Sequence, residues 1–305
     1  MTEPVATTGE CPTGASVSGR PLNRRDVLKL GAALVPCIVG APLAAQWVVP
    51  AADAATTRIG TERPALPAPA VPEAAGTASA GTDRRWGFVV DVSKCIGCGS
   101  CVDACKLENH VPLEPEYNRT WVERHAVAED GSVFIDSPDG GIHGFPPEST
   151  APGAAGQPID HSFFMPRLCM QCENPPCVAV CPVSATYKTG DGVVLVDQSR
   201  CIGCGYCVVA CPYGARYIVP SGSETPTGWA GVADKCTWCY HRTTRGRQPA
   251  CVEACPVGAR VFGDMNDPAS PISGILREQP AQVLKPELGT NPRVWYVGLE
   301  GEAEA

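Results

Sequence analysis

Residues 201–212 read CIGCGYCVVACP, and this stretch decides the fold. Its four cysteines are spaced Cys-x2-Cys-x2-Cys-x3-Cys and are followed by proline, and Gly203 and Gly205 lie among the first three. Three cysteines within seven residues can meet one small object only from a tight loop, because a strand or a helix turns successive side chains in different directions. Glycine allows the positive φ angles that such a loop requires. The stretch therefore predicts a loop that holds a compact group through its thiols.

The chain carries this cysteine pattern four times. Eighteen cysteines are present, and sixteen of them form four tetrads. The second and fourth tetrads are stretched, with four residues directly before Cys177 and eleven before Cys251, but both keep the terminal Cys-x3-Cys-Pro. A modest increase in loop length costs little closure entropy, so the third cysteine can still reach its place. The tetrads are Cys95, Cys98, Cys101 and Cys105; Cys169, Cys172, Cys177 and Cys181; Cys201, Cys204, Cys207 and Cys211; and Cys236, Cys239, Cys251 and Cys255.

Sixteen thiolates are the ligands that four cubane [4Fe–4S] clusters require, and the spacing at residues 201–212 is that of bacterial two-cluster ferredoxins. In those proteins the fourth cysteine of each run ligates the other cluster. Structural zinc would suit the fourth tetrad alone, and a disulfide framework would suit an even number of cysteines in an exported chain. Neither alternative requires a pattern repeated four times. We therefore expect all sixteen cysteines to hold four [4Fe–4S] clusters.

Residues next to the tetrads can tune such clusters. Lys94, Arg200 and Lys235 each precede the first cysteine of a tetrad, where a cation either offsets the negative charge of the cluster or is simply solvated. Ile96 and Ile202 follow a first cysteine. We expect these two side chains to shield the clusters from water, because solvent exposure is one determinant of reduction potential.

Signs of other functions are absent from the sequence. The five histidines form no metal-ligand pair at helical spacing, and no Ser–His–Asp arrangement, phosphate-binding glycine loop or catalytic carboxylate pair is recognisable. The net charge of −8 argues against nucleic acid as a partner and favours docking onto basic protein surfaces. The sequence thus favours an electron-transfer protein over an enzyme.

Residues 1–54 have the features of a twin-arginine signal segment. Arg24 and Arg25 precede a mildly apolar stretch that two prolines interrupt, and small residues follow it. A transmembrane helix needs about 20 strongly apolar residues, so we expect a targeting segment, with a retained anchor as the alternative. The twin-arginine route carries folded proteins, which suits a chain whose cofactors are inserted before export. Cys11 and Cys37 lie in this segment, and we do not expect them to be ligands.

Three further parts are expected after the signal segment. Residues 55–83 form a Pro/Ala-rich linker, residues 84–300 form a four-cluster ferredoxin-like domain, and residues 301–305 form an acidic tail. The linker composition buries no apolar surface. The domain is short of core residues, so metal binding would contribute much of its folding free energy.

We expect an α+β domain made of two interleaved bacterial-ferredoxin-like modules, with short β-hairpins and short helices around the clusters and long loop insertions. The repeat is visible because residues 211–216, CPYGAR, parallel residues 255–260, CPVGAR, and residues 181–186, CPVSAT, are a looser copy. Short helices are expected after the last cysteine of each tetrad. Strands are expected at 86–92, 132–135 and 192–196.

Longer stretches carry a family resemblance. Residues 101–109 read CVDACKLEN, residues 236–240 CTWCY, residues 262–268 FGDMNDP and residues 284–296 LKPELGTNPRVWY. Together with the tetrads, they resemble the four-cluster iron–sulfur subunit of the DMSO reductase family, including the subunits of polysulfide, tetrathionate and formate-dependent nitrite reductase systems. The resemblance covers about residues 86–298.

This resemblance implies how the clusters share their cysteines. The first tetrad would pair with the fourth, and the second with the third, each lending its last cysteine to its partner. The four implied ligand sets are Cys95, Cys98, Cys101 and Cys255; Cys236, Cys239, Cys251 and Cys105; Cys169, Cys172, Cys177 and Cys211; and Cys201, Cys204, Cys207 and Cys181.

The resemblance also implies partners and a location. The chain would be an exported, non-catalytic subunit, periplasmic or on the outer face of the cytoplasmic membrane. It would relay electrons between a polytopic, quinone-reactive membrane subunit and a molybdopterin or multihaem catalytic subunit. The alternative is a subunit of a transmembrane redox complex that lacks a molybdopterin enzyme, of the sulfite-reduction-associated type. A soluble ferredoxin shuttle is a third hypothesis.

Overall fold

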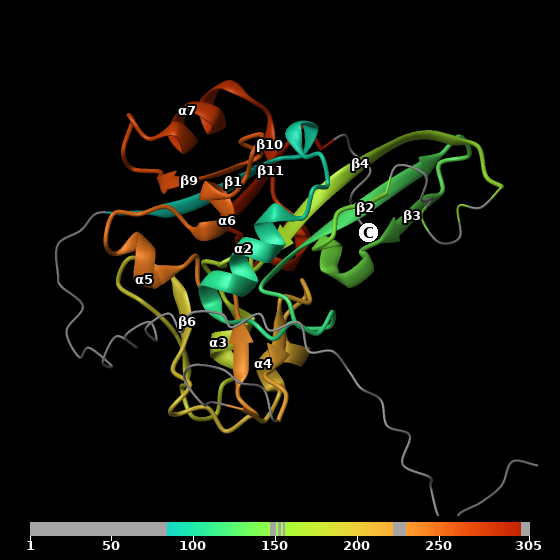
Figure 1. Cartoon of the computed structure of the whole chain (residues 1–305). Coiled ribbons are helices and arrows are strands. Elements are labelled where there is room, and N and C mark those ends of the chain that lie inside the picture. The colour runs from blue at the N-terminus through green and yellow to red at the C-terminus, as the bar shows by residue number, and fades with distance from the viewer. Residues whose placement is uncertain (1–83, 147–150, 152–153, 155, 222–229, 300–305) are drawn as a thin grey trace, which may run out of the picture. The chain divides into compact units, whose positions relative to one another are not determined.

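The computed structural model describes residues 84–146, 151, 154, 156–221 and 230–299 (Figure 1). The expected signal segment, linker and acidic tail lie outside these residues. Within the described ranges, no helix is long and apolar enough to span a membrane. The elements follow in the order β1 (Trp86–Asp91), η2 (Val92–Lys94), α2 (Ser100–Asn109), β2 (Thr120–Ala128), β3 (Val133–Asp136), η3 (Pro138–Gly141), β4 (Ile159–Leu168), α3 (Pro176–Ala179), β5 (Thr186–Lys188), β6 (Val194–Val196), α4 (Tyr206–Val209), β7 (Arg216–Ile218), β8 (Ala233–Lys235), α5 (Tyr240–Thr243), α6 (Ala250–Glu253), β9 (Arg260–Asp264), α7 (Pro271–Glu278), β10 (Ala281–Gln282), η4 (Pro286–Leu288) and β11 (Val294–Val297).

Antiparallel strand pairs connect each cysteine tetrad to the next. A strand that follows one tetrad pairs with a strand that precedes the next one: β2 with β4, β5 with β6, and β7 with β8. The series closes on itself, because β9 follows the fourth tetrad and pairs with β1, which precedes the first. Each pair returns the chain to the same region after a tetrad, so the four cysteine loops are gathered in space.

Four sheets result from this connectivity. The largest has the strand order β10-β11-β1-β9, in which β11 runs parallel to β1 and joins the two ends of the domain. A second sheet has the order β3-β2-β4, and two further sheets have two strands each. Short helices together with mainly antiparallel strands are the expected α+β composition.

The helices do not lie where the sequence predicted them. α3, α4 and α6 each contain the third cysteine of a tetrad and end two residues before the fourth, and α2 contains both. The expectation that helices follow the last cysteines is therefore wrong. The reason is that a Cys-x3-Cys spacing covers one helical turn, and the proline after the last cysteine of three tetrads stops the helix there.

Two pairs of these helices pack together. α2 contacts α6, and α3 contacts α4. Figure 1 shows α2 beside α6 near β1 and β9, whereas α3 and α4 lie together at the bottom of the view. The first pair brings together the first and fourth tetrads, and the second pair brings together the second and third.

Three expected strands are confirmed, but the two longest were missed. The strands at 86–92, 132–135 and 192–196 correspond to β1, β3 and β6. β2 and β4 escaped prediction because they carry charged residues and Pro166, which are unusual within strands. β4 is an edge strand, where the missing N–H of a proline is tolerated, and Arg124 of β2 pairs with Asp136 of β3 at 2.8 Å.

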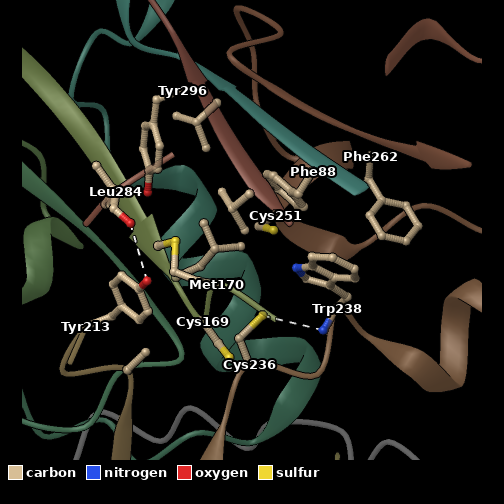
Figure 2. Packing of buried hydrophobic residues seen from close by; sticks show 14 of the residues in the cluster. Phe88, Cys169, Met170, Tyr213, Cys236, Trp238, Cys251, Phe262, Leu284 and Tyr296 are labelled. Atoms are coloured by element: carbon tan, nitrogen blue, oxygen red, sulfur yellow. Dashed lines mark hydrogen bonds between the residues drawn. The ribbon is translucent and has the colours of Figure 1, made fainter. Parts of the chain in front are cut away.

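The main apolar core lies against the ligand loops (Figure 2). Trp238, between two cysteines of the fourth tetrad, is only 1% exposed. Its ring lies 6.3 Å from that of Phe88 on β1 and 5.4 Å from that of Phe262 on β9. The packing of the largest sheet therefore also positions the loop that begins at Cys236.

Candidate iron–sulfur cluster sites

The helix that carries each third cysteine begins in one of two ways. In the first and third tetrads, Gly99 and Gly205 precede α2 and α4 in the left-handed conformation, with φ of 77° and 76°. In the stretched tetrads, Pro175 and Pro249 precede α3 and α6. Glycine allows the chain to turn sharply out of a tight loop, whereas proline suits the longer loop, because its fixed φ is compatible with a helix start.

Cys211 joins three cysteines of the second tetrad. A cavity is lined by Cys169, Cys172, Cys177 and Cys211, together with Met170, Gln171, Pro175, Pro176, Val194, Pro212, Tyr213 and Arg216. Burial raises the pKa of Cys172 to about 12, and the thiols of Cys169, Cys177 and Cys211 add to the shift. The structure thus places the last cysteine of the third tetrad with the first three of the second.

Cys105 joins three cysteines of the fourth tetrad. The Asn109 side-chain amide lies 3.5 Å from Sγ of Cys105 and 3.6 Å from Sγ of Cys239. Burial raises the pKa of Cys105, and the thiols of Cys239, Cys236 and Cys251 raise it further. These four thiols are buried.

Cys255 lies near cysteines of the first tetrad. Burial raises the pKa of Cys95 to about 11, and the neighbouring thiols of Cys101 and Cys255 contribute. Cys98, from the same tetrad, is exposed. This group therefore opens to the surface on one side, unlike the group around Cys105.

The remaining four cysteines lie around α3 and α4. Cys207 lies in α4, and Cys181 follows two residues after the end of α3, which packs against α4. Cys201 and Cys207 pack among the same apolar side chains as Cys177. Cys204 is exposed. The packing of α3 on α4 thus brings Cys181 and Cys207 into the same region, and Cys201 packs in the same apolar cluster as Cys207.

Backbone amides donate to several of the thiols. Such hydrogen bonds stabilise negative charge on sulfur and are a known determinant of cluster potential. The donors and acceptors are Thr186 N and Cys181 at 3.4 Å, Ala233 N and Cys201 at 3.3 Å, Trp238 N and Cys236 at 3.4 Å (Figure 2), and Ala259 N and Cys255 at 3.2 Å.

Only some of the residues expected to supply charge to the clusters, or to shield them from water, are buried. Lys235 is fully buried, but Lys94 is exposed and pairs with Asp91 at 2.8 Å, and Arg200 is exposed. Ile96 and Ile202 are 57% and 64% exposed, so the expectation that they shield the clusters is wrong. The reason is that the ligand loops of the first and third tetrads lie at the surface.

Two buried arginines near the thiols were missed in the sequence. Arg216 and Arg260 are 5% and 2% exposed, and Arg216 donates to Sγ of Cys177 at 3.1 Å. Both occupy the same place in the repeats CPYGAR and CPVGAR. That repeated arginine, five residues after a last cysteine, was the signal that could have identified them.

The buried charges fit a negatively charged group among the thiols. In the part of the chain that the structure describes, Nε and Nη1 of Arg260 are buried without a hydrogen-bond partner. Arg260 also interacts electrostatically with Cys95, Cys101 and Cys251. A buried guanidinium is costly unless an anion lies beside it. A thiolate-ligated iron–sulfur cluster would be such an anion.

The sixteen tetrad cysteines are free, which contradicts the disulfide alternative. Across the described ranges, no three His, Cys, Asp or Glu side chains converge closely enough to hold a single metal ion. The thiols of Cys169, Cys172, Cys177 and Cys211 instead line a cavity.

Comparison with known families and proteins agrees with this chemistry. Two families, each described as a 4Fe-4S dicluster domain, match residues 94–185 and 160–265. The chain is 43% identical to a tetrathionate reductase subunit of Salmonella typhimurium, over 71% of this chain and 74% of that protein. It is 46% identical to the corresponding tetrathionate reductase subunit of Archaeoglobus fulgidus, over 71% and 84% of the two chains. It is 40% identical to a putative dimethyl sulfoxide reductase iron–sulfur subunit of Halobacterium salinarum, over 71% and 80%. Two dicluster domains and sixteen cysteines fit four [4Fe–4S] clusters.

Proposed function

The chain belongs to the [4Fe–4S] iron–sulfur subunits of the DMSO reductase family, and we propose that it relays electrons within such a reductase complex. It would connect a quinone-reactive membrane subunit with a molybdopterin or multihaem catalytic subunit, and would itself perform no substrate chemistry. Each bound cluster would supply one-electron transfer. The protein would hold the clusters in order and would separate the interior ones from water.

The proposed ligand sets combine cysteines of different tetrads. We number them along the domain as sites 1 to 4. Electrostatic interactions among thiols support sites 1 to 3, and the packing of α3 on α4 supports site 4. Site 1 is Cys95, Cys98, Cys101 and Cys255; site 2 is Cys236, Cys239, Cys251 and Cys105; site 3 is Cys169, Cys172, Cys177 and Cys211; and site 4 is Cys201, Cys204, Cys207 and Cys181.

The helix pairs support two interleaved ferredoxin-like modules. α2 and α6 bring sites 1 and 2 together, and α3 and α4 bring sites 3 and 4 together. Each module thus takes its two halves from separate tetrads, as in two-cluster ferredoxins, where the fourth cysteine crosses to the other cluster.

The single observation that carries the proposed relay is that cysteines of successive proposed sites lie near one another. Cys251 of site 2 interacts electrostatically with Cys101 of site 1. Cys236 of site 2 interacts with Cys169 of site 3, and Figure 2 shows the two side by side. Sites 3 and 4 meet where Cys177 and Cys207 pack in one apolar cluster. An electron can therefore pass from site 1 to site 4 through two intermediate sites.

The cysteines of the two interior sites are more buried than those of the two terminal sites, which suits a relay between two partners. All four cysteines of site 2 are buried, as are three of the four in site 3. Exposed cysteines occur at the two terminal sites, Cys98 in site 1 and Cys204 in site 4. Electrons would enter at one end and leave at the other, while the interior sites are protected from solvent.

Apolar side chains surround the exposed ends. At site 4, Ile202, Tyr206 and Val209 are 64%, 61% and 88% exposed, and Ile96 is exposed beside site 1. Exposed apolar groups gathered at a functional site are typical of protein-binding surfaces. They support a docked partner at each end, which would also complete the shielding of the terminal sites.

We further propose that the chain is exported by the twin-arginine route and works at the outer face of the cytoplasmic membrane. Arg24 and Arg25 and the apolar stretch after them support this proposal. Because that route carries folded proteins, the clusters can be inserted before export.

Purification of the tagged full chain from its native membranes tests the proposed function. We expect it to bring with it a polytopic membrane protein and a molybdopterin or multihaem subunit, identified by mass spectrometry, with electron transfer from a quinol analogue reducing the bound clusters. A polytopic partner without any molybdopterin or haem subunit would instead identify the sulfite-reduction-associated type, which the names of the similar proteins do not favour.

A further inference from the structure

Three buried cations each lie between two neighbouring sites of the row. They are Arg260 at the start of β9, Lys235 at the end of β8 and Arg216 at the start of β7, and their exposed fractions are 2%, 0% and 5%. We infer that each of these three side chains raises the reduction potentials of the two sites between which it lies. We also infer that each one allows those two neighbouring sites to be reduced at the same time. This inference rests on the proposed relay.

Arg260 lies between sites 1 and 2. Its guanidinium interacts electrostatically with Cys95 and Cys101 of site 1 and with Cys251 of site 2. Only Nη2 has a hydrogen-bond partner among the described residues, Oγ1 of Thr120 at 2.8 Å, and the other two nitrogens are buried and unpartnered. Those nitrogens lack a protein acceptor, so they are available to the sulfur atoms of a bound cluster.

Arg216 lies between sites 3 and 4. It donates to Sγ of Cys177 at 3.1 Å and interacts electrostatically with Cys169 of site 3 and Cys207 of site 4. Arg216 and Arg260 thus perform the same task at equivalent places in the two modules.

Lys235 lies between sites 2 and 3. It interacts electrostatically with Cys236 of site 2 and with Cys177 of site 3, and its Nζ donates to the carbonyl of Cys236 at 2.7 Å. On the strand pair β7–β8, Lys235 is directly opposite Arg216. Like charges in directly opposite positions repel each other, so this buried arrangement requires anions on both sides.

Protein carboxylates do not supply those anions. In the part of the chain that the structure describes, none of the three cations forms an ion pair with Asp or Glu. By contrast, a carboxylate neutralises another arginine near the thiols, because Arg119 pairs with Asp234 at 2.8 Å. The thiolates and the clusters they hold are therefore the counter-ions of Arg260, Lys235 and Arg216.

The physical effect follows from the sign of the charge. Reduction adds one electron to a site and makes it more negative, so a fixed cation beside the site favours reduction. A cation between two sites also offsets the repulsion between two added electrons. Both effects are strong where water is excluded, as it is around sites 2 and 3.

A redox titration of the cluster-loaded full chain, followed by electron paramagnetic resonance, tests the inference. For Arg260→Gln we expect two of the four reduction steps to move to lower potential. The equilibrium constant for each of these steps should fall about tenfold, which corresponds to about 59 mV for one electron. Arg216→Gln should move the other two steps, and Lys235→Gln should move one step from each of these two pairs. Lys94→Gln is the matched control, because Lys94 is exposed and ion-paired, and it should move none.

Charge-retaining variants separate this role from a purely structural one. Arg260→Lys and Arg216→Lys should keep potentials near those of the unsubstituted chain. Iron loss in a glutamine variant but not in its lysine counterpart would equally show that the charge is required. The inference is overturned if iron-replete glutamine variants titrate unchanged, if all four steps shift alike, or if lysine and glutamine variants behave the same. None of these readings depends on partner subunits, so they are independent of the purification test above.

Discussion

The side-chain amide of Asn109 lies 3.6 Å from Sγ of Cys239, although 130 residues separate the two in the sequence. The same amide lies 3.5 Å from Sγ of Cys105. Arg119 donates to the amide oxygen of Asn109 at 2.9 Å, and the amide nitrogen that lies near the two thiols also donates to the carbonyl oxygen of Cys105 at 3.1 Å. Asn109 therefore marks a point at which thiols of the first and fourth tetrads lie close together.

Replacing Asn109 should lower the potential of site 2. In Asn109→Leu, the thiols of Cys105 and Cys239 lose a hydrogen-bond donor, and fewer donors to sulfur mean a less favourable reduction. We expect one of the four steps in a redox titration to move to lower potential, with the iron content unchanged. Asn118→Leu is the control, because its amide hydrogen-bonds the carbonyl of Pro115 instead. A shift of equal size in the control would contradict the role of Asn109.

The crossed ligand sets can be tested with two pairs of substitutions. Cys204→Ala combined with Cys181→Ala removes two ligands from site 4 alone, so about twelve of about sixteen iron atoms should remain. Cys204→Ala combined with Cys211→Ala removes one ligand from site 4 and one from site 3.

In the second pair, electron paramagnetic resonance should show two altered clusters. If each tetrad instead held its own cluster, the outcomes of the two pairs would be exchanged. Iron analysis and spectroscopy of the reduced chains decide between the arrangements.

Gly203→Ala should remove the cluster from site 4. Gly203 has φ of +68°, and a Cβ atom there would collide with the carbonyl oxygen of Gly231, so the ligand loop would have to move. Gly205→Ala is a matched control, since Gly205 also has positive φ, but no described atom lies within 4 Å of its added Cβ. The control bears only the cost of a left-handed alanine, about 1–2 kcal/mol. Equal iron contents in the two variants would show that the clash is unimportant.

Glu108→Gln should weaken the contact between α2, which carries cysteines of the first tetrad, and the insertion within the fourth tetrad. Glu108 of α2 accepts hydrogen bonds from Arg242 at 2.6 Å and His241 at 2.7 Å, and both donors lie in the eleven-residue insertion before Cys251. Loss of hydrogen bonds between charged groups costs about 1.5–3 kcal/mol. We expect faster release of iron to a chelator at neutral pH, with Glu278→Gln, an exposed glutamate at the end of α7, as the control.

The charge of Glu108 itself should not vary with pH near neutrality. Burial opposes ionisation of Glu108, but its hydrogen bonds to His241 and Arg242 outweigh burial and lower its pKa. A folded pKa below the unfolded value contributes stability above the unfolded pKa of about 4.3, and that stability is lost only as the pH falls through the folded pKa. The ionisation of Glu108 itself should therefore cause no change in the difference in iron release between Glu108→Gln and the unsubstituted chain from about pH 6 to 9. A steep change within that range would point to another group.

Local spacing predicted the cysteine loops well, and local patterning predicted the strands less well. β1, β3 and β6 were recognisable because they are short and apolar or bounded by turn residues. β2 and β4 were not, because they carry charged residues whose partners include residues on neighbouring strands. Arg167 of β4 pairs with Glu123 of β2 at 3.2 Å, and Arg124 of β2 pairs with Asp136 of β3 at 2.8 Å. A charged strand is stable only where such partners exist, and a single segment does not show them.

The sequence by itself determined the chemistry of this protein. Cysteine spacing is a local property, and a loop that places three thiols within seven residues already specifies a compact iron–sulfur ligand set. The family resemblance implied which cysteines of different tetrads share a cluster, and only the tertiary structure shows which of their thiols lie near one another and which cations are buried beside them. Lys94 and Lys235 each directly precede the first cysteine of a tetrad, yet Lys94 is exposed to solvent and Lys235 is fully buried. Burial depends on the strands and loops that cover a residue, and these come from distant parts of the chain.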